Sequence, residues 1–170
     1  MTKPQETANR ISGGATFGPR RRYRYRLWRT WNSDGARVLF VLLNPSTADE
    51  RVNDPTIRRC IGFARAWGYG GVEIVNIFAY RSTDPAALRE ISDPIGPRND
   101  YHIKAARRRS ARCIAAWGNH GTHLERGARV LKALRRLGDV DCLCETQTGQ
   151  PGHPLYISAN AMPRRMSHRS

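Results

Sequence analysis

Residues 38–43 form a continuous run of Val, Leu and Phe that stops abruptly at Asn44 and Pro45. A run without polar alternation predicts a strand that is covered on both faces of its sheet. Proline cannot donate to the hydrogen-bond ladder, so pairing should end at Asn44. Open α/β sheets bind ligands at the carboxyl ends of their strands, and this segment therefore predicts a functional edge that carries Asn44.

Further apolar runs predict more strands, and the segments between them carry helical signals. Strands are expected at residues 72–78, 113–118 and 140–144. Helices are expected at residues 54–68, after residues 82–85, after residues 96–100 and at residues 123–137. The first of these begins with an acidic residue followed by proline, which is typical of a helix start. The alternation predicts a three-layer α/β/α sandwich with a mostly parallel central sheet.

The N-terminal part predicts an antiparallel hairpin. Residues 23–31 alternate aromatic and basic side chains, which indicates a strand with one aromatic and one cationic face. The turn formers at residues 32–35 are expected to lead from this strand into the strand at residues 38–43. We expect residues 1–14 to be a flexible arm, residues 15–160 a single α/β domain, and residues 161–170 a basic tail.

Composition sets limits on the class of protein. The chain has 170 residues, of which 39% are hydrophobic, and this suits one domain with one core. No apolar stretch reaches the ~18 to 20 residues of a membrane span, and the N-terminus lacks an apolar signal core. The four cysteines lack the spacing of a zinc site or a disulfide framework, which indicates reduced, mostly buried thiols. We expect a cytoplasmic monomer with no membrane partner, metal or cofactor.

The charge of the chain is its strongest compositional signal. The formal net charge is +15, which favours a polyanionic partner, and nucleic acid is the obvious candidate. We expect this partner to be DNA, single- or double-stranded. Of the 29 basic residues 26 are arginine, so the coding bias of a genome is an alternative source of the charge.

Polar groups follow several of the predicted strands. These groups are Asn44, Asn76, the turn after Trp117 and Gly118, and His153 in the loop after the last strand. In a parallel sheet all of them can reach one edge. Each has a structural alternative, because asparagine often caps a helix or closes a turn, histidine in a Gly/Pro loop is often exposed, and tryptophan suits a core.

Four short segments occur in a recognisable order: Leu42-Leu43-Asn44-Pro45-Ser46, Ile74-Val75-Asn76-Ile77-Phe78-Ala79-Tyr80-Arg81, Ala116-Trp117-Gly118 and Gly152-His153-Pro154-Leu155. This order resembles the uracil-DNA glycosylase superfamily. The resemblance implies that the first segment holds the attacking water, that the middle asparagine reads the base edge, and that the late His-Pro loop contacts the base and the DNA backbone.

Other segments resemble a second family over roughly residues 15–158. They are Tyr23-Arg24-Tyr25, Leu43-Asn44-Pro45-Ser46-Thr47-Ala48-Asp49, Asn53-Asp54-Pro55-Thr56 and His153-Pro154-Leu155-Tyr156. Together they look like the bacterial family known as domain of unknown function sixteen-forty-three. This resemblance covers most of the chain but carries no activity with it.

The chemistry implied by the glycosylase resemblance suits these residues. Breaking an N-glycosidic bond requires an oriented water and a hydrogen-bond donor to the departing base. We expect Asn44 to orient the water, His153 to stabilise the base, and Asn76 to read a Watson–Crick edge. The further candidates are Asp49 or Asp54 as a general base, Phe78, Tyr80 or Trp117 as a stacking face, Arg81 for a phosphate, and Pro45, Ser46, Gly118 and Pro154 as substrate contacts.

The leading hypothesis is a metal-free, monofunctional DNA glycosylase that acts on a flipped or unpaired base. The arginine runs at residues 20–22 and 107–109 could bind phosphates, or they could be solvated faces. Two alternatives remain open for the function: a nucleic-acid-binding module without catalysis, and a hydrolase of free nucleotides or nucleosides.

Overall fold

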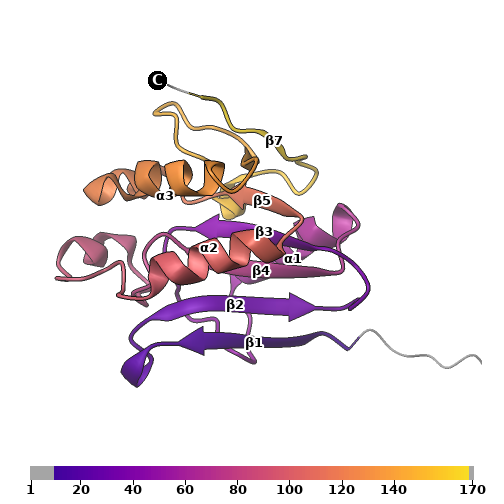
Figure 1. Cartoon of the computed structure of the whole chain (residues 1–170), viewed down its shortest axis with the longest axis horizontal. Coiled ribbons are helices and arrows are strands. Elements are labelled where there is room, and N and C mark those ends of the chain that lie inside the picture. The colour runs from indigo at the N-terminus through magenta and orange to yellow at the C-terminus, as the bar shows by residue number, and fades with distance from the viewer. Residues whose placement is uncertain (1–9, 169–170) are drawn as a thin grey trace, which may run out of the picture.

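The computed structural model describes residues 10–168, which contain a seven-stranded sheet in the order β1-β2-β4-β3-β5-β6-β7 (Figure 1). The strands are β1 (Ser12–Phe17), β2 (Arg24–Thr30), β3 (Arg37–Leu42), β4 (Gly71–Asn76), β5 (Arg112–Ala115), β6 (Asp141–Cys142) and β7 (Arg164–Arg165). The helices are α1 (Pro55–Ala66), α2 (Asn99–Arg109) and α3 (Arg126–Arg135). Within residues 10–168, no helix is long and apolar enough to span a bilayer.

The middle of the sheet is parallel and its edges are antiparallel. Strands β4, β3, β5 and β6 run in one direction, whereas β1 and β2 at one edge and β7 at the other pair antiparallel to their neighbours. The expected mostly parallel sheet is confirmed for its central part. The expected helix at residues 54–68 is also confirmed, because α1 begins at Pro55 with Asp54 as its N-cap.

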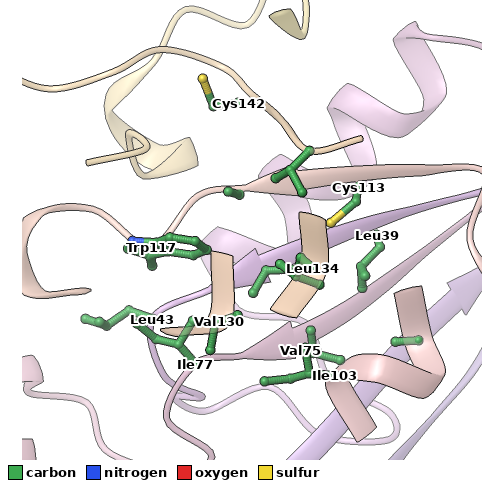
Figure 2. Close-up of a cluster of buried hydrophobic side chains, with 14 of the residues drawn as sticks. Leu39, Leu43, Val75, Ile77, Ile103, Cys113, Trp117, Val130, Leu134 and Cys142 are labelled. Carbon is green, nitrogen blue, oxygen red and sulfur yellow. The ribbon is translucent and has the colours of Figure 1, made fainter. Parts of the chain in front are cut away.

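Helices cover both faces of the sheet, as the three-layer prediction required. Side chains of β3 alternate between the two faces, so that Phe40 packs with the α1 residues Ile57 and Phe63, while Leu39 packs with Ile103 of α2. Figure 2 shows the cluster on the face covered by α2 and α3, which also contains Val75, Ile77, Val130 and Leu134. Both faces of β3 are therefore buried from solvent, which explains its uninterrupted apolar sequence.

The expected hairpin between β2 and β3 is wrong. Strand β4 lies between β2 and β3, and β2 pairs antiparallel with β4. The N-terminal hairpin instead joins β1 and β2 through a turn at residues 18–23, with Ser12 opposite Thr30. The segment at residues 32–35 therefore links two strands that are not neighbours.

The sheet extends beyond the expected limits of the domain. Strand β1 begins at Ser12, so the end of the expected arm belongs to the sheet, while residues 1–9 lie outside the described part. In the expected tail, β7 pairs with β6 and Met166 is buried. Both ends of the chain thus contribute edge strands.

The carboxyl ends of β3 and β5 determine where a ligand site can form. Strand β3 continues into α1 on one face of the sheet, whereas β5 continues through a 3-10 segment (Asn119–Glu125) into α3 on the other face. Neighbouring strands whose connections diverge in this way create the topological switch point at which open α/β sheets bind ligands.

Candidate functional site

A cavity of about 650 Å³ lies at this switch point. Its volume falls within the range of about 300–1,000 Å³ that is typical of ligand pockets. The lining comes from the exits of β3, β4, β5 and β6, from the start of α1 and from the loop before residue 157. The lining residues are Leu43, Asn44, Ser46, Thr47, Asp54, Pro55, Thr56, Ser82, Thr83, Pro85, Trp117, Gly118, Asn119, His120, Cys144, Thr146, Gly152, His153, Leu155, Tyr156 and Ile157.

The amide of Asn44 has a defined orientation in this cavity. Its Nδ2 donates to the backbone oxygens of Pro45 at 3.1 Å and Ser82 at 2.8 Å. Both partners are carbonyls that can only accept, so the nitrogen and oxygen of the amide cannot be exchanged. No described residue donates to Asn44 Oδ1. The loops after β3 and β4 thus hold Asn44 so that its oxygen can accept a hydrogen bond from a ligand or a water.

His153 also lines the cavity, at the start of a 3-10 turn, Pro154–Tyr156. Its Nδ1 accepts from the backbone N–H of Leu155 at 3.3 Å, so the neutral ring carries its proton on Nε2. Burial lowers the pKa of His153 below its usual value of 6.5, and the charge of Asp54 opposes this shift in part. His153 is therefore a neutral Nε2–H donor at pH 7.

The lowered pKa of His153 makes the folding stability of the protein depend on pH. Because its pKa is lower in the folded than in the unfolded protein, folding stability from this group is present above pH 6.5 and declines as the pH falls below that value. We expect an NMR titration of the His153 ring to show a midpoint below 6.5. A midpoint above 6.5 would mean that Asp54, and not burial, dominates its surroundings.

The loop that carries His153 is anchored from α1. Arg59 Nε donates to the backbone oxygen of Pro154 at 3.3 Å, and its Nη2 donates to that of Ile157. Gly152 precedes the histidine and lies so close to Cys144 that a side chain there would clash with the sulfur. The glycine and Arg59 together set the path of the loop past the cavity.

The two candidate general bases are placed differently. Asp54 lines the cavity, where its Oδ1 accepts from Ile57 N at 2.9 Å and its Oδ2 accepts from Ala48 N at 3.3 Å. Asp49 does not line the cavity. Its Oδ1 instead accepts from the backbone N–H groups of Arg51 and Val52 in a tight turn, and these hydrogen bonds lower the pKa of Asp49. Of the carboxylates in residues 10–168, Asp54 alone lines the cavity.

Asn76, expected to read a base, does not line the cavity. Its side chain is 1% exposed, and its Oδ1 accepts from Nη2 of the buried Arg24 at 3.3 Å. The sheet pairing continues past it, since Ile77 N donates to Leu42 O and Phe78 N to Leu43 O. Asn76 thus lies inside the sheet, one step before the strand exit.

The other predicted contacts divide in the same way. Ser46, Trp117 and Gly118 line the cavity. Trp117 also belongs to the core, since it is only 2% exposed, and its Nε1 donates to Gln150 Oε1. Pro45, Phe78, Tyr80, Arg81 and Pro154 do not line it. Phe78 is 0% exposed and belongs to the apolar cluster on the α2 and α3 face of the sheet.

Several lining residues were missed by sequence reasoning. They are hydroxyl, amide and imidazole groups at the start of α1, in the 3-10 segment after β5 and in the loops after β4 and β6: Thr56, Ser82, Thr83, Asn119, His120 and Thr146. Turn residues of these types carry no periodic signal, and only their position after a strand could have indicated them. Among residues 10–168, no lysine or arginine lines the cavity and no cluster of side chains could hold a metal ion.

Cys144 can report on the cavity. Cys60, Cys113 and Cys142 are buried, and burial raises the pKa of the Cys113 thiol to about 12. Cys144 is partly exposed and lines the cavity. We expect a thiol reagent to modify the native protein at Cys144 orders of magnitude faster than at the other three, because reaction requires an accessible thiolate. Cys144→Ser is the control, and rapid modification of that variant would contradict the placement.

One family model spans most of the chain. The model described as "Protein of unknown function (DUF1643)" matches residues 24–155. The chain belongs to this family. The match includes all cavity-lining residues except Tyr156 and Ile157, so the cavity is essentially contained in the DUF1643 region. No curated protein and no solved structure matches the chain.

Proposed function

We propose that the protein is a DNA glycosylase-type hydrolase that excises a base, modified or mismatched, by cleaving its N-glycosidic bond. The observation that carries this proposal is the pairing, in one cavity, of a fixed acceptor at Asn44 Oδ1 with a neutral donor at His153 Nε2. The resemblance of the motifs around both residues to the uracil-DNA glycosylase superfamily supports it.

The proposed reaction uses these two groups on opposite sides of the sugar. Asn44 Oδ1 accepts a hydrogen bond from a water whose oxygen attacks C1′ of the sugar. The C1′–N bond breaks, and its electron pair leaves with the base, whose developing negative charge is stabilised by His153 Nε2–H. The water loses its proton once the new C–O bond forms, and Asp54 is the carboxylate that can accept it and release it to solvent, from which the departed base anion takes up a proton. Water and nucleoside thus give a free base and a sugar with a hydroxyl at C1′.

The charges of the lining favour a nucleobase over a phosphate in the cavity. Phosphates are bound by lysine, arginine or backbone amides, and in the described part of the chain no lysine or arginine side chain lines the cavity. The strongly basic remainder of the chain can then hold a polyanionic backbone outside it. This division suits a base that enters from a DNA strand better than a free nucleotide enclosed with its phosphate.

The test is release of bases from a panel of natural and modified DNAs. Mass spectrometry should detect a free base, and the DNA should acquire alkali-labile abasic sites. Parallel reactions on the corresponding nucleosides and nucleotides separate the two hydrolase hypotheses. Binding of DNA without release of any base from the panel would favour the non-catalytic module.

A further inference from the structure

Four arginines gather beside the cavity at the turn between β1 and β2. We define the arginine turn as Arg20, Arg21, Arg22 and Arg81. The backbone links it to the cavity, since Arg81 N donates to Arg22 O and Ser82 N donates to Pro45 O. The antiparallel pairing of β2 with β4 places this turn at the carboxyl edge of the parallel strands (Figure 1). The arginine turn therefore lies on the same edge as Asn44.

The arginine turn is a fixed structure and not a loose charged loop. The Phe17 ring contacts two guanidinium groups, with Arg21 Cζ 3.7 Å and Arg81 Cζ 5.1 Å from its ring centroid. Arg81 Nη1 also donates to Arg21 O at 3.4 Å. Arg20 and Arg21 both have φ 54°, a left-handed conformation that side-chain-bearing residues rarely adopt. These contacts hold the arginines in place at the cost of backbone strain.

Most of the positive charge in this turn is uncompensated by the protein. Arg21 pairs with Glu50 at 2.7 Å, and both partners remain largely exposed. Arg20 and Arg22 are exposed, and neither side chain makes a hydrogen bond or an ion pair with residues 10–168. Arg81 is half-buried; its Nε is buried without a hydrogen-bond partner in the described chain, so only its outer nitrogens could reach a phosphate. The turn thus presents free guanidinium donors beside a cavity that has none.

The other arginine run of the chain differs in both position and contacts. Residues 107–109 end α2, whose following strand β5 starts at the opposite, amino edge of the parallel strands (Figure 1). Arg107 donates to the backbone oxygen of Asp139, and Arg109 pairs with the buried Glu73. Only Arg108 of this run is free of such contacts among residues 10–168. Two sequence runs that look alike therefore have different roles.

We propose that the arginine turn binds the phosphodiester backbone of the DNA strand whose nucleotide occupies the cavity. This inference rests on the proposed function and specifies the surface that the DNA contacts. Within the described residues the cavity lining contains no lysine or arginine, whereas the four arginines of the arginine turn lie beside the cavity. A base can therefore enter the cavity while the phosphates next to it in the strand stay on the arginine turn. Guanidinium groups bind phosphate oxygens with charge-assisted hydrogen bonds, which suits the free donors of this surface.

The experiment compares two pairs of charge removals. Arg20→Gln with Arg22→Gln changes the arginine turn, and Lys104→Gln with Arg108→Gln removes the same charge from exposed positions of α2. Binding of a fluorescein-labelled single-stranded oligonucleotide is measured by anisotropy at several salt concentrations. We expect the turn pair to weaken binding on the order of tenfold at 0.1 M salt and to reduce the salt slope by about 0.7 per lost contact. The α2 double variant should bind with nearly the same affinity and the same salt slope as the unmodified protein.

A third variant separates binding from folding. Arg20→Gly removes a charge but relieves the left-handed strain, so its melting temperature should not fall while its DNA affinity does. Equal weakening by the turn pair and the α2 pair would overturn the inference, even if the protein releases bases. Selective weakening by the turn pair in a protein that releases no base would support the inference and reject the proposed glycosylase activity.

Discussion

His153→Asn is expected to lower the rate of base excision by about 10²–10³-fold, the loss typical of removing one donor from a developing anion. The donor at Nε2 strengthens as charge accumulates on the departing base, so its loss should reduce kcat more than it weakens binding. Single-turnover excision measured on the DNA identified by the base-release panel tests this. The protein fold should survive, because asparagine also serves well as an N-cap.

The choice of asparagine separates two roles of the histidine. His153 Nδ1 accepts from Leu155 N, and the Asn side-chain oxygen can replace this acceptor while lacking a group at the Nε2 position. His153→Ala removes both. We expect both variants to lose the same activity but only His153→Ala to melt at a lower temperature. Full activity in His153→Asn would remove this residue from the mechanism.

Asn44 provides an independent check on the same site. Asn44→Asp keeps an acceptor toward the cavity but puts a carboxylate where Nδ2 now donates to Pro45 O and Ser82 O. Repulsion between these oxygens should release the loop after β4 from the exit of β3. We therefore expect Asn44→Asp to lose activity together with order at Ser82, visible as faster amide hydrogen exchange there.

The central β3–α1–β4 unit could be predicted from the sequence because its signals are local. Apolar residues 38–43 specify a buried strand, and Asp54 with Pro55 specifies the start of α1. Asp54 caps the helix with one oxygen and holds Ala48 with the other, so the same residue that starts the helix also shapes the cavity wall. The local signal for the helix start thus also marks a residue that lines the cavity.

The position of β2 could not be predicted because its partner lies far along the chain. The residues at 32–35 have the composition of a hairpin turn, but Trp31 N and Asn32 N both donate to Gly70 O. A side chain at Gly70 would clash with the backbone oxygen of Asn32, so this turn packs against the entry of β4. Turn composition indicates a change of direction and does not specify which strand follows in space.

Asn76 shows why an asparagine in an apolar run is an ambiguous signal. Register places it opposite Leu42 in the last residue pair of β3 and β4, where it meets the buried Arg24, and hydrogen bonds between the two segments continue to Phe78. Burial lowers the pKa of this arginine to about 10, although nearby Asp54 counteracts the shift. The alternating arginines of β2 suggested a cationic face, but Arg24 and Arg29 are 1% and 3% exposed. Arg29 Nη2 donates to Asp49 O, and Arg24 Nη1 to Ala48 O, so both hold the loop before Asp54.

The largest stability effect is expected at Glu73, a fully buried carboxylate in the middle of β4. It accepts from Arg26 Nε at 3.0 Å and from Arg109 Nε at 2.9 Å, and Arg37 lies 3.7 Å away. Glu73→Gln removes the carboxylate that pairs with all three arginines and turns an amide N–H toward their donors.

Breaking a buried ion pair from one side leaves the remaining charges unpaired, and we expect Glu73→Gln to lower the free energy of unfolding by about 3 kcal/mol. This is the lower end of the usual range, because the arginine side chains are 20–36% exposed and water can solvate them in part. Glu50→Gln is the matched control: its pair with Arg21 is exposed, and its loss should cost less than about 1 kcal/mol. Urea unfolding followed by tryptophan fluorescence measures both, and similar small losses would show that Glu73 is dispensable for the sheet.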